Sequence, residues 1–415
     1  MRSLISTTLL ASLSVLGATQ AVAQNTYKVA YIDMLSGPFA NVGEIMLTHV
    51  QYAVEDINAK GGVLGGTKMQ LLQFDSKLSA QESQSALQAA IDQGVQAVIT
   101  GGSGSSVVAA LVQSVNRWNS RNPGKEIVIM NHSSIDPELT GKSCNFWHFQ
   151  TEANTAMKMK AIANYIKKTP EVKKVFLLNQ DYAHGKQWAS YGRQLVGLAR
   201  PDIQFVGETL HPMGRVKDFA PYIANIRQSG ADSVITGNWG QDLALMLKAA
   251  GDAGYDLRYF NHSAGGAPGT VTAVSQAKMG RVTWVAEWHP GQAGVPKAEA
   301  LAKAYKARTG KDFLAPRIDM TPRILAAAIN KAGSLESLKV ARAMENLEFD
   351  SVVGKVRMRA EDHQLLIPQV VNTIAKVDGK TVTVGWEGTD YGFQTDAAYS
   401  GNEVAQGTEC KMQRP

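Results

Sequence analysis

Two clusters of small polar residues stand where apolar runs end, and their chemistry suits the binding of an anion. Ser103-Gly104-Ser105-Ser106 lies between a predicted strand and a predicted helix, and His132-Ser133-Ser134 follows the next strand. Hydroxyl groups and free backbone N–H groups at a helix N-terminus can hold a carboxylate or a phosphate. The first cluster alone is equally compatible with an ordinary serine N-cap. The second cluster favours a ligand site, which would contain Ser105, Ser106, His132, Ser133 and Ser134.

Both patterns occur a second time, about 130 residues further along the chain. Val98-Ile99-Thr100-Gly101 is matched by Val234-Ile235-Thr236-Gly237, and Asn131-His132-Ser133 is matched by Asn261-His262-Ser263. This spacing is that of a domain rather than of a short solenoid repeat. An apolar run that ends in glycine and small polar residues is typical of a buried strand that opens into a loop. We therefore predict two similar α/β lobes whose strand ends face each other across a cleft, because open α/β sheets bind ligands beyond those ends.

Aromatic and histidine side chains follow the predicted strands of the second lobe. Tyr182 and His184 come after its first strand, and Trp239 comes after its third. In a cleft, aromatic rings provide a wall for the apolar part of a ligand, although ordinary packing explains them equally well. The histidines have no metal-ligand spacing, so we interpret them as neutral hydrogen-bonding groups. The predicted site therefore also contains Tyr182, His184, Trp239, His262 and Ser263.

Motifs for catalysis and for cofactor binding are incomplete. Gly102-Ser103-Gly104 opens like a dinucleotide-binding fingerprint, but Val107 stands at the position of the third glycine. The same region resembles a nucleophile elbow without its final glycine, since Ser105 stands there. The sequence contains no Walker loop, no His-Glu-x-x-His and no Cys-x-x-Cys. We expect no catalytic residue, no cofactor and no metal.

The N-terminal residues have the composition of a cleavable signal peptide. Arg2 gives a positive start, Leu4–Val15 is mostly apolar or small, and Ala21-Val22-Ala23 has the small-x-small cleavage pattern. The apolar stretch is too short for a membrane anchor. We expect cleavage near Ala23 and a mature protein in the periplasm.

The composition of the whole chain is that of an ordinary globular protein, with 44% hydrophobic and 19% charged residues. The chain after Ala23 is too long for a single ordinary hydrophobic core, and its length suits two domains. The net charge is only +6, and no run of Lys and Arg exceeds two residues, so we expect no nucleic-acid binding. In an oxidising compartment, the two cysteines Cys144 and Cys410 predict a disulfide, with two buried free thiols as the alternative.

Strand and helix patterns alternate along most of the chain, which predicts parallel sheets with helical connections. The predicted strands are 27–33, 69–74, 97–100, 127–130, 174–178, 203–206, 234–236, 258–260, 283–288, 353–358, 369–377 and 381–384. The predicted helices are 42–59, 80–93, 107–118, 153–168, 186–200, 216–229, 242–253, 297–308, 323–332 and 337–345. We assign the chain to lobe 1 (24–150 and 289–347) and lobe 2 (151–288 and 348–415), with crossovers near Gln150, Glu287 and Glu348.

Several longer motifs extend over essentially the whole mature chain. They are Leu35-Ser36-Gly37-Pro38-Phe39-Ala40, Asp56-Ile57-Asn58-Ala59-Lys60-Gly61-Gly62-Val63, Ser105-Ser106, Asp136-Pro137-Glu138-Leu139-Thr140, Asp181-Tyr182-Ala183-His184-Gly185 and Asp218-Phe219. In combination they resemble the type I periplasmic solute-binding proteins, specifically the leucine/isoleucine/valine-binding family of ABC importers. The resemblance implies two Rossmann-like lobes with parallel sheets, joined by three crossovers, which close on a small solute. It also implies a membrane permease as partner, and we expect a monomer.

By this resemblance, the chain retains the residues of the family's binding site that hold the carboxylate of the ligand. Ser105 matches the serine that holds the ligand carboxylate in the family. Ser133 and Ser134 match contacts of the backbone and side chain before the Pro-Glu-Leu-Thr run. Ile135, however, stands where a threonine is usual, and Val42 replaces an aromatic residue.

The half of the site that holds an ammonium group is not retained. Trp239 falls near a tyrosine that touches the amino end of the ligand in the family, and Ser263 stands where an acidic residue pairs with the α-ammonium. A buried ammonium without a counter-charge is costly. An aromatic carboxylate therefore suits the predicted site at least as well as leucine does.

Three classes of function follow from these residues. The first is the periplasmic substrate-binding subunit of an ABC importer of the branched-chain amino acid type, which captures an amino acid or an aromatic acid and has no enzymatic activity. The second is a periplasmic ligand sensor that docks a receptor and has the same fold. The third is a secreted serine hydrolase that uses Ser105 and a histidine, but no motif fixes the nucleophile geometry that this chemistry needs.

Overall fold

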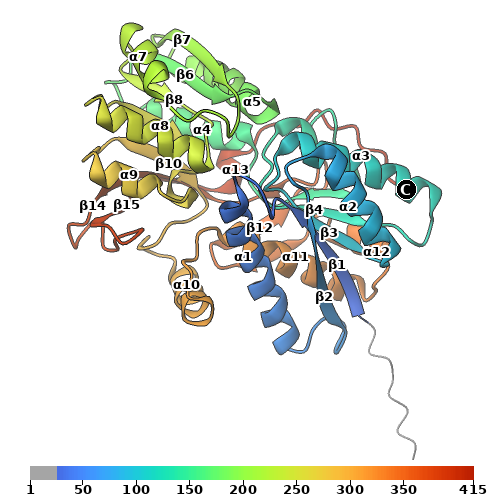
Figure 1. Ribbon diagram of the computed structural model, residues 1–415. Coiled ribbons are helices and arrows are strands. Elements are labelled where there is room, and N and C mark those ends of the chain that lie inside the picture. The colour runs from blue at the N-terminus through green and yellow to red at the C-terminus, as the bar shows by residue number, and fades with distance from the viewer. Residues whose placement is uncertain (1–25) are drawn as a thin grey trace, which may run out of the picture.

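Two α/β lobes lie side by side, each built around its own sheet (Figure 1). The computed structural model describes residues 26–415, so the predicted signal peptide 1–23 lies outside the described residues. The segments coloured blue to teal form most of the first lobe, and the segments coloured green to yellow form most of the second. Within residues 26–415, no helix is long and apolar enough to cross a membrane. The prediction of an α/β fold with parallel sheets is confirmed.

The first sheet is fully parallel, with five strands in the order β2-β1-β3-β4-β5. Its strands are β1 (Thr26–Asp33), β2 (Lys68–Asp75), β3 (Ala97–Thr100), β4 (Val128–Asn131) and β5 (His148–Gln150). Every residue of β3 and β4 is buried, as expected for short apolar strands covered on both faces. Because the strands are parallel, the clusters that follow β3 and β4 meet at one edge of the sheet.

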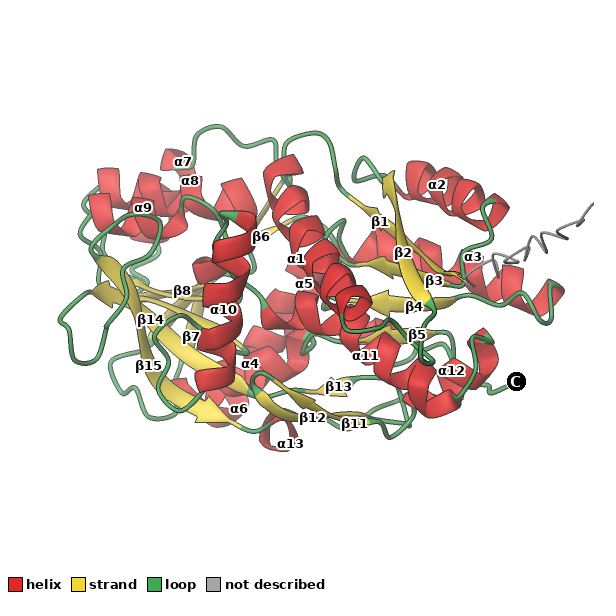
Figure 2. Cartoon of the chain, turned by 90° about the horizontal axis from the view of Figure 1, so that it is seen from below, coloured by secondary structure: helices red, strands yellow, loops and turns green. Residues whose placement is uncertain are grey.

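The second sheet has seven strands in the order β15-β14-β10-β9-β8-β6-β7. Its strands are β6 (Lys174–Gln180), β7 (Gln204–His211), β8 (Ser233–Ile235), β9 (Arg258–Asn261), β10 (Val282–Ala286), β14 (Gln369–Lys376) and β15 (Tyr391–Tyr399). Strands β6 to β10 are parallel, whereas β14 is antiparallel to both of its neighbours. Seen from below, this sheet lies to the left and the first sheet to the right (Figure 2).

Helices connect the strands and cover the sheets. They are α1 (Ala40–Ala59), α2 (Ala80–Asp92), α3 (Ser105–Arg121), α4 (Thr155–Ile166), α5 (Ala183–Tyr191), α6 (Gly197–Ala199), α7 (Ala220–Gln228), α8 (Gly240–Asp252), α9 (Thr270–Gln276), α10 (Pro296–Thr309), α11 (Pro316–Ala332), α12 (Ser337–Met344) and α13 (Gly401–Val404). In the first lobe, α2 packs on α3, and α11 packs on both α1 and α12. In the second lobe, α4 packs on α5, and α8 packs on α7 and α9. Helices α3 and α8 begin directly at the strand ends that form the cleft.

A small antiparallel sheet of β11 (Glu348–Ser351), β12 (Gly354–Met358) and β13 (Leu365–Leu366) lies against the first lobe. The ring of His363 stacks on Phe149 of β5 with centroids 4.0 Å apart. The backbone N–H of Gln150 donates to the carbonyl of His363 at 2.9 Å. Residues 348–366, which the sequence analysis groups with lobe 2, therefore contact the first sheet. The residue bounds of the two lobes stay a prediction.

The segment 381–384 is not a strand, so that prediction is wrong. The carboxylate of Asp378 accepts hydrogen bonds from the backbone N–H groups of Lys380, Thr381 and Val382, and it thereby holds them in a turn. The edge of β14 pairs instead with β15, a strand that the sequence analysis does not predict.

Cys144 and Cys410 form a disulfide, with their Cα atoms 5.6 Å apart. The chain leaves the second sheet at β15, passes through α13 and returns to the first lobe, beside which the C-terminus is drawn (Figure 1). The disulfide therefore ties the tail that follows the second sheet to the first lobe.

Candidate functional site

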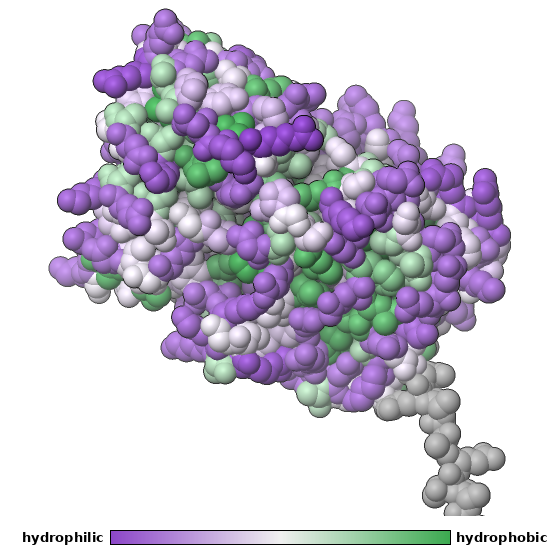
Figure 3. All heavy atoms as spheres, viewed as in Figure 1, coloured by the Kyte–Doolittle hydropathy of each residue, from purple (hydrophilic) through white to green (hydrophobic). Residues whose placement is uncertain are grey.

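A cavity lies between the two lobes, at the carboxyl ends of the parallel strands of each sheet. It contains about 920 Å³ of empty space, part of which is open to solvent. The face of the molecule in Figure 3 is mostly hydrophilic, with apolar side chains between the lobes and over part of the first lobe. The first lobe contributes Gly101, Gly102, Gly104, Ser105, Ser133 and Ser134, and the second contributes Tyr182, His184, Trp239, Gly240, His262 and Ser263. The repeated sequence patterns thus meet in one place.

The start of α3 is built to face the cavity. Gly101 and Gly104 have φ angles of +151° and +92°, which suit glycine, and a Cβ at Gly101 would lie 2.5 Å from the backbone nitrogen of Ser133. Ser105 is the first residue of α3, and no side chain caps this helix. The positive end of the helix dipole therefore lies at the cavity that Ser105 lines, an arrangement suited to an anion.

The repeated asparagine fixes the loop after each equivalent strand. Asn131 donates to the carbonyl of Ser134 at 2.8 Å, and its Oδ1 accepts the backbone N–H groups of Ser133 and Ser134. In the second lobe, Asn261 donates to the carbonyl of Asn238 at 2.8 Å, and its Oδ1 accepts the N–H of Ser263 at 2.7 Å. Both asparagines are fully buried and hold the loops through these hydrogen bonds, whereas Ser133, Ser134, His262 and Ser263 line the cavity.

Neutral histidines and aromatic rings form the second-lobe wall. The Nε2 atoms of His184 and His262 lie 3.0 Å apart, and both are close to the carbonyl oxygen of Gly237. Burial lowers the pKa of His184 to about 4 and that of His262 well below its usual value. Trp239 donates its indole N–H to the hydroxyl of Tyr182 at 2.7 Å. This wall therefore carries no charge at neutral pH.

Two of the predicted site residues lie outside the cavity lining. Ser106 is exposed on α3, and His132 is fully buried beneath the loops, with Nε2 3.4 Å from Asp33. The other eight predicted ligand contacts line the cavity together, namely Ser105, Ser133, Ser134, Tyr182, His184, Trp239, His262 and Ser263. Among the described residues, no histidine is hydrogen-bonded to Ser105, so the structure gives no support to the hydrolase alternative.

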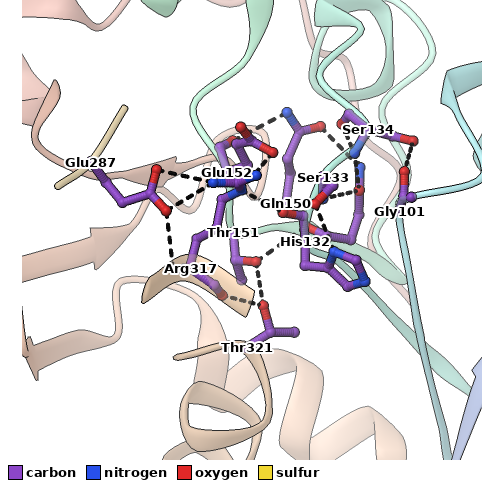
Figure 4. A network of polar contacts seen from close by, with 12 residues as sticks. Gly101, His132, Ser133, Ser134, Gln150, Thr151, Glu152, Glu287, Arg317 and Thr321 are labelled. Atoms are coloured by element: carbon purple, nitrogen blue, oxygen red, sulfur yellow. Dashed lines mark hydrogen bonds and ion pairs between the residues drawn. The ribbon is translucent and has the colours of Figure 1, made fainter. Parts of the chain in front are cut away.

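The sequence analysis misses a largely buried cluster of four charged residues beside the cavity, which we call the charge quartet: Glu152, Lys158, Glu287 and Arg317. Figure 4 shows Glu152, Glu287 and Arg317 of this cluster. The ammonium of Lys158 lies 2.8 Å from Glu152, whose other oxygen lies 2.8 Å from Nε of Arg317. Arg317 also binds Glu287 at 2.9 Å. Burial raises the pKa of Glu287, but Arg317 and Lys158 outweigh burial and lower it. Two cations thus neutralise two carboxylates.

Glu152 and Arg317 line the cavity directly, as do His49 and Trp284. Arg317 is missed because the predicted helix begins after Pro322, whereas α11 begins at Pro316 and contains Pro322 in its interior. A proline inside a helix removes one helical hydrogen bond, so a sequence pattern favours a helix that starts after Pro322 rather than one that contains it. Glu152 follows β5, whose three residues are too short to give a strand pattern.

Comparisons with known proteins agree on one family. The sequence model of the family described as periplasmic binding protein matches residues 26–381. The Leu/Ile/Val-binding protein homolog 4 of Brucella abortus is 31% identical, covering 98% of this chain and 97% of that protein. A closed-conformation crystal structure of the leucine-, isoleucine-, valine-, threonine-, and alanine-binding protein from Brucella ovis has a TM-score of 0.85 and 29% identity, covering 94% of this chain and 100% of that chain.

A more distant solved structure has the same fold. It is a solute-binding protein of an ABC transporter from Rhodopseudomonas palustris in complex with 3,4-dihydroxy benzoic acid, with a TM-score of 0.76, 16% identity, and coverage of 91% of this chain and 98% of that chain. The chain belongs to the periplasmic binding protein family of solute-binding proteins.

Proposed function

We propose that this member of the periplasmic binding protein family is the substrate-binding subunit of an ABC importer of the branched-chain amino acid type. It binds a small carboxylate-bearing solute between its two lobes and catalyses no reaction. The observation that carries the proposal is the position of Ser105 at the uncapped start of α3, facing a largely apolar cavity. The names of the relatives from Brucella, which refer to binding of leucine, isoleucine and valine, support a solute of this size.

The solute's carboxylate would lie against Ser105 and the N-terminus of α3. A charge-assisted hydrogen bond from the hydroxyl and the helix dipole both favour an anion there. The apolar part of the solute would lie against Trp239 and Trp284, with Val42 and Ile135 on the first-lobe side. These four side chains leave room for either a branched or an aromatic group.

An α-ammonium group contributes little to binding in this proposal. Ser263 lines the cavity and carries no charge. Glu152 is the acid that does line the cavity, but its two oxygens are already paired with Lys158 and Arg317. Lys158 and Arg317 already balance the charges of Glu152 and Glu287, so a ligand ammonium there would be a buried cation without a counter-charge of its own. The site therefore takes carboxylates without requiring an amino group.

Residues 1–23 would direct the chain to the periplasm and be removed after Ala23. The mature protein would act as a monomer and deliver its solute to a membrane permease. These assignments rest on the signal-peptide composition and on membership of the family.

Leucine, 4-methylpentanoate (leucine without its amino group) and benzoate are the test ligands. Binding to the mature protein is measured by thermal shift and then by calorimetry, because a bound ligand raises the stability of the folded state. We expect 4-methylpentanoate or benzoate to bind at least as tightly as leucine. Tight leucine binding together with failure of 4-methylpentanoate would overturn the assignment of the ammonium half.

Ser105→Ala tests the anchor, with Ser106→Ala as a matched control on the next residue of the same helix. Loss of a hydrogen bond to a charged group costs about 1.5–3 kcal/mol, so Ser105→Ala should raise Kd by roughly ten- to a hundredfold. Ser106 is exposed and outside the cavity lining, so Ser106→Ala should leave Kd unchanged. Equal effects of the two substitutions would contradict the proposed site.

A further inference from the structure

A buried carboxylate lies beneath the loop that leads into α3. Asp33, the last residue of β1, is fully buried. One of its oxygens accepts the Ser103 hydroxyl at 2.6 Å, and the other accepts the backbone N–H of Gly102 at 2.8 Å. Burial raises the pKa of Asp33, but His132 and these two hydrogen bonds outweigh burial and hold it below its usual value. Asp33 is therefore a negative charge placed directly under the cavity wall.

His132 contacts both this carboxylate and Ser133, which lines the cavity. Its Nε2 is 3.4 Å from Oδ2 of Asp33, and its Nδ1 is 2.8 Å from the hydroxyl of Ser133. Nε2 is buried and has no hydrogen-bond partner among the described residues. A lone pair on Nε2 would face the charge of Asp33 and be repelled, whereas a proton there is attracted. Asp33 therefore selects the form of His132 that carries its proton on Nε2.

The protonation of His132 decides which way the Ser133 hydroxyl can point. When His132 is neutral with its proton on Nε2, Nδ1 is an acceptor, so Ser133 donates to it and presents lone pairs to the cavity. When His132 takes a second proton, Nδ1 donates to Ser133, whose own hydrogen is then free to donate to a ligand. Ser134 has no such choice, because its hydroxyl already donates to the carbonyl of Gly101 at 2.7 Å.

We propose that Asp33 and His132 are positioning residues that set the hydrogen-bond polarity of Ser133, so that a carboxylate is bound together with one proton on His132. The inference rests on the proposed function, in which the cavity takes a carboxylate. A ligand that presents a neutral or donating group to Ser133 would bind without that proton.

Aromatic and charged groups from three elements pack around His132. The ring of Tyr31 in β1 lies parallel to it at 6.1 Å, and His49 of α1 interacts with it electrostatically. Arg317 of α11 donates Nε–H to the carbonyl oxygen of His132 at 3.1 Å. Arg317 opposes a second proton, but Glu152 and Glu287 neutralise Arg317. Of the charged groups in contact with the ring, Asp33 is then the one that favours a second proton on His132.

Calorimetry with 4-methylpentanoate tests the proposal between about pH 5.5 and pH 8, in two buffers of different ionisation enthalpy. We expect uptake of one proton per ligand at the alkaline end, where Kd should rise by up to tenfold per pH unit. The matching amide, 4-methylpentanamide, carries no charge and should bind without proton uptake. Equal proton uptake for both ligands, or none for the carboxylate, would overturn the proposal.

Asp33→Asn and His132→Gln should each abolish proton uptake and flatten the pH dependence of Kd. His289→Gln is the matched control, since His289 is a buried histidine outside the cavity lining. It should retain proton uptake. If His289→Gln loses proton uptake as well, or if folded Asp33→Asn retains it, the assignment to Asp33 and His132 is wrong.

Nitrogen NMR of the histidine rings in the ligand-free protein separates this inference from the proposed function. His132, assigned by comparison with His132→Gln, should show the Nε2-protonated neutral form at about pH 8. The Nδ1-protonated form would overturn the inference even if the ligands bind. Absence of binding by every carboxylate, with the Nε2-protonated form observed, would instead count against both the proposed ligand class and the coupled uptake of a proton.

Discussion

Phe39 packs against Trp239 with ring centroids 4.4 Å apart. Phe39 precedes α1 in the first lobe, and Trp239 precedes α8 in the second, so the contact joins the lobes across the cavity. Gly240 makes room for it, because a Cβ there would lie 2.8 Å from the ring of Phe39. The pair is therefore formed only when the two lobes are close together.

Phe39→Ala should weaken ligand binding by favouring the open arrangement of the lobes. An aromatic pair contributes about 0.5–1.5 kcal/mol beyond its buried area, so Kd should rise at least about two- to tenfold. Small-angle scattering should show ligand-bound wild type as more compact than the ligand-free protein, with a smaller difference in the variant. Leu198→Ala, which truncates an exposed apolar side chain, is the control and should change neither quantity. Identical profiles with and without saturating ligand would rule out closure.

Buried histidines predict a loss of stability in mild acid. Burial lowers the pKa of His148 to about 3, that of His49, His184 and His289 to about 4, and that of His262 well below its usual value. In the unfolded chain these groups take protons near pH 6.5, so between pH 6.5 and pH 4 the unfolded state binds more protons than the folded state. The free energy of unfolding should therefore fall as the pH falls below 6.5, by about 1.4 kcal/mol per pH unit for each such group.

Urea denaturation at pH 7, 6 and 5 measures this dependence. His289→Gln should reduce the slope of the unfolding free energy against pH by the contribution of one histidine, because His289 lies outside the cavity lining and titrates by itself. A free energy of unfolding that stays constant from pH 7 to pH 5 would show that these histidines are not held neutral.

Local patterns were enough to predict the strands that lead to the serines and the second-lobe aromatic residues of the cavity. The apolar runs that form β3, β4, β8 and β9 lead into glycine, serine or asparagine. At these strand ends the serines of the first lobe meet the aromatic residues of the second lobe. Strand β15 and the segment 381–384 show the limit of such patterns. The alternation of Thr and Val in 381–384 suits a strand, but the turn at Asp378 binds the backbone N–H groups of Thr381 and Val382, and β15 pairs with the edge of β14.

The charge quartet could not be predicted from local patterns, because its members come from three separate segments of the chain. Glu152 and Lys158 are close in sequence, whereas Glu287 and Arg317 join them only through the fold. A lone charged residue in a sequence gives no sign of whether it is buried or exposed. The sequence analysis also places His132 in the cavity together with Ser133 and Ser134. The side chain of His132 instead lies beneath the loop, near Asp33.

Removal of the disulfide should lower stability and free the tail. Cys144 and Cys410 are 266 residues apart, so the cross-link restricts a very long loop in the unfolded chain. The double variant Cys144→Ser/Cys410→Ser should lose about 2–5 kcal/mol of unfolding free energy. Mass spectrometry of non-reduced peptides from periplasmic material should find the two cysteines linked. Two freely alkylated thiols in native material, or an unchanged melting temperature in the double variant, would contradict this prediction.

Glu152→Gln should destabilise the protein far more than loss of an exposed acid, because it leaves a buried charge without its partner. The side chains of Glu152 and Lys158 are only 4% and 1% exposed. Breaking a buried ion pair by removing one partner costs about 3–5 kcal/mol. Asp252→Asn is the matched control, since Asp252 pairs with Lys248 at 2.6 Å on the surface, where an ion pair contributes little.

The double variant Glu152→Gln/Lys158→Met separates loss of the pair from loss of the acid. It removes both charges of that pair, so it should be more stable than Glu152→Gln alone, and denaturation of all four proteins in the cycle gives the coupling energy. Arg317 retains Glu287 as a partner in every variant, which limits the damage to one side of the charge quartet. If the two substitutions destabilise additively, Glu152 and Lys158 do not depend on each other for burial.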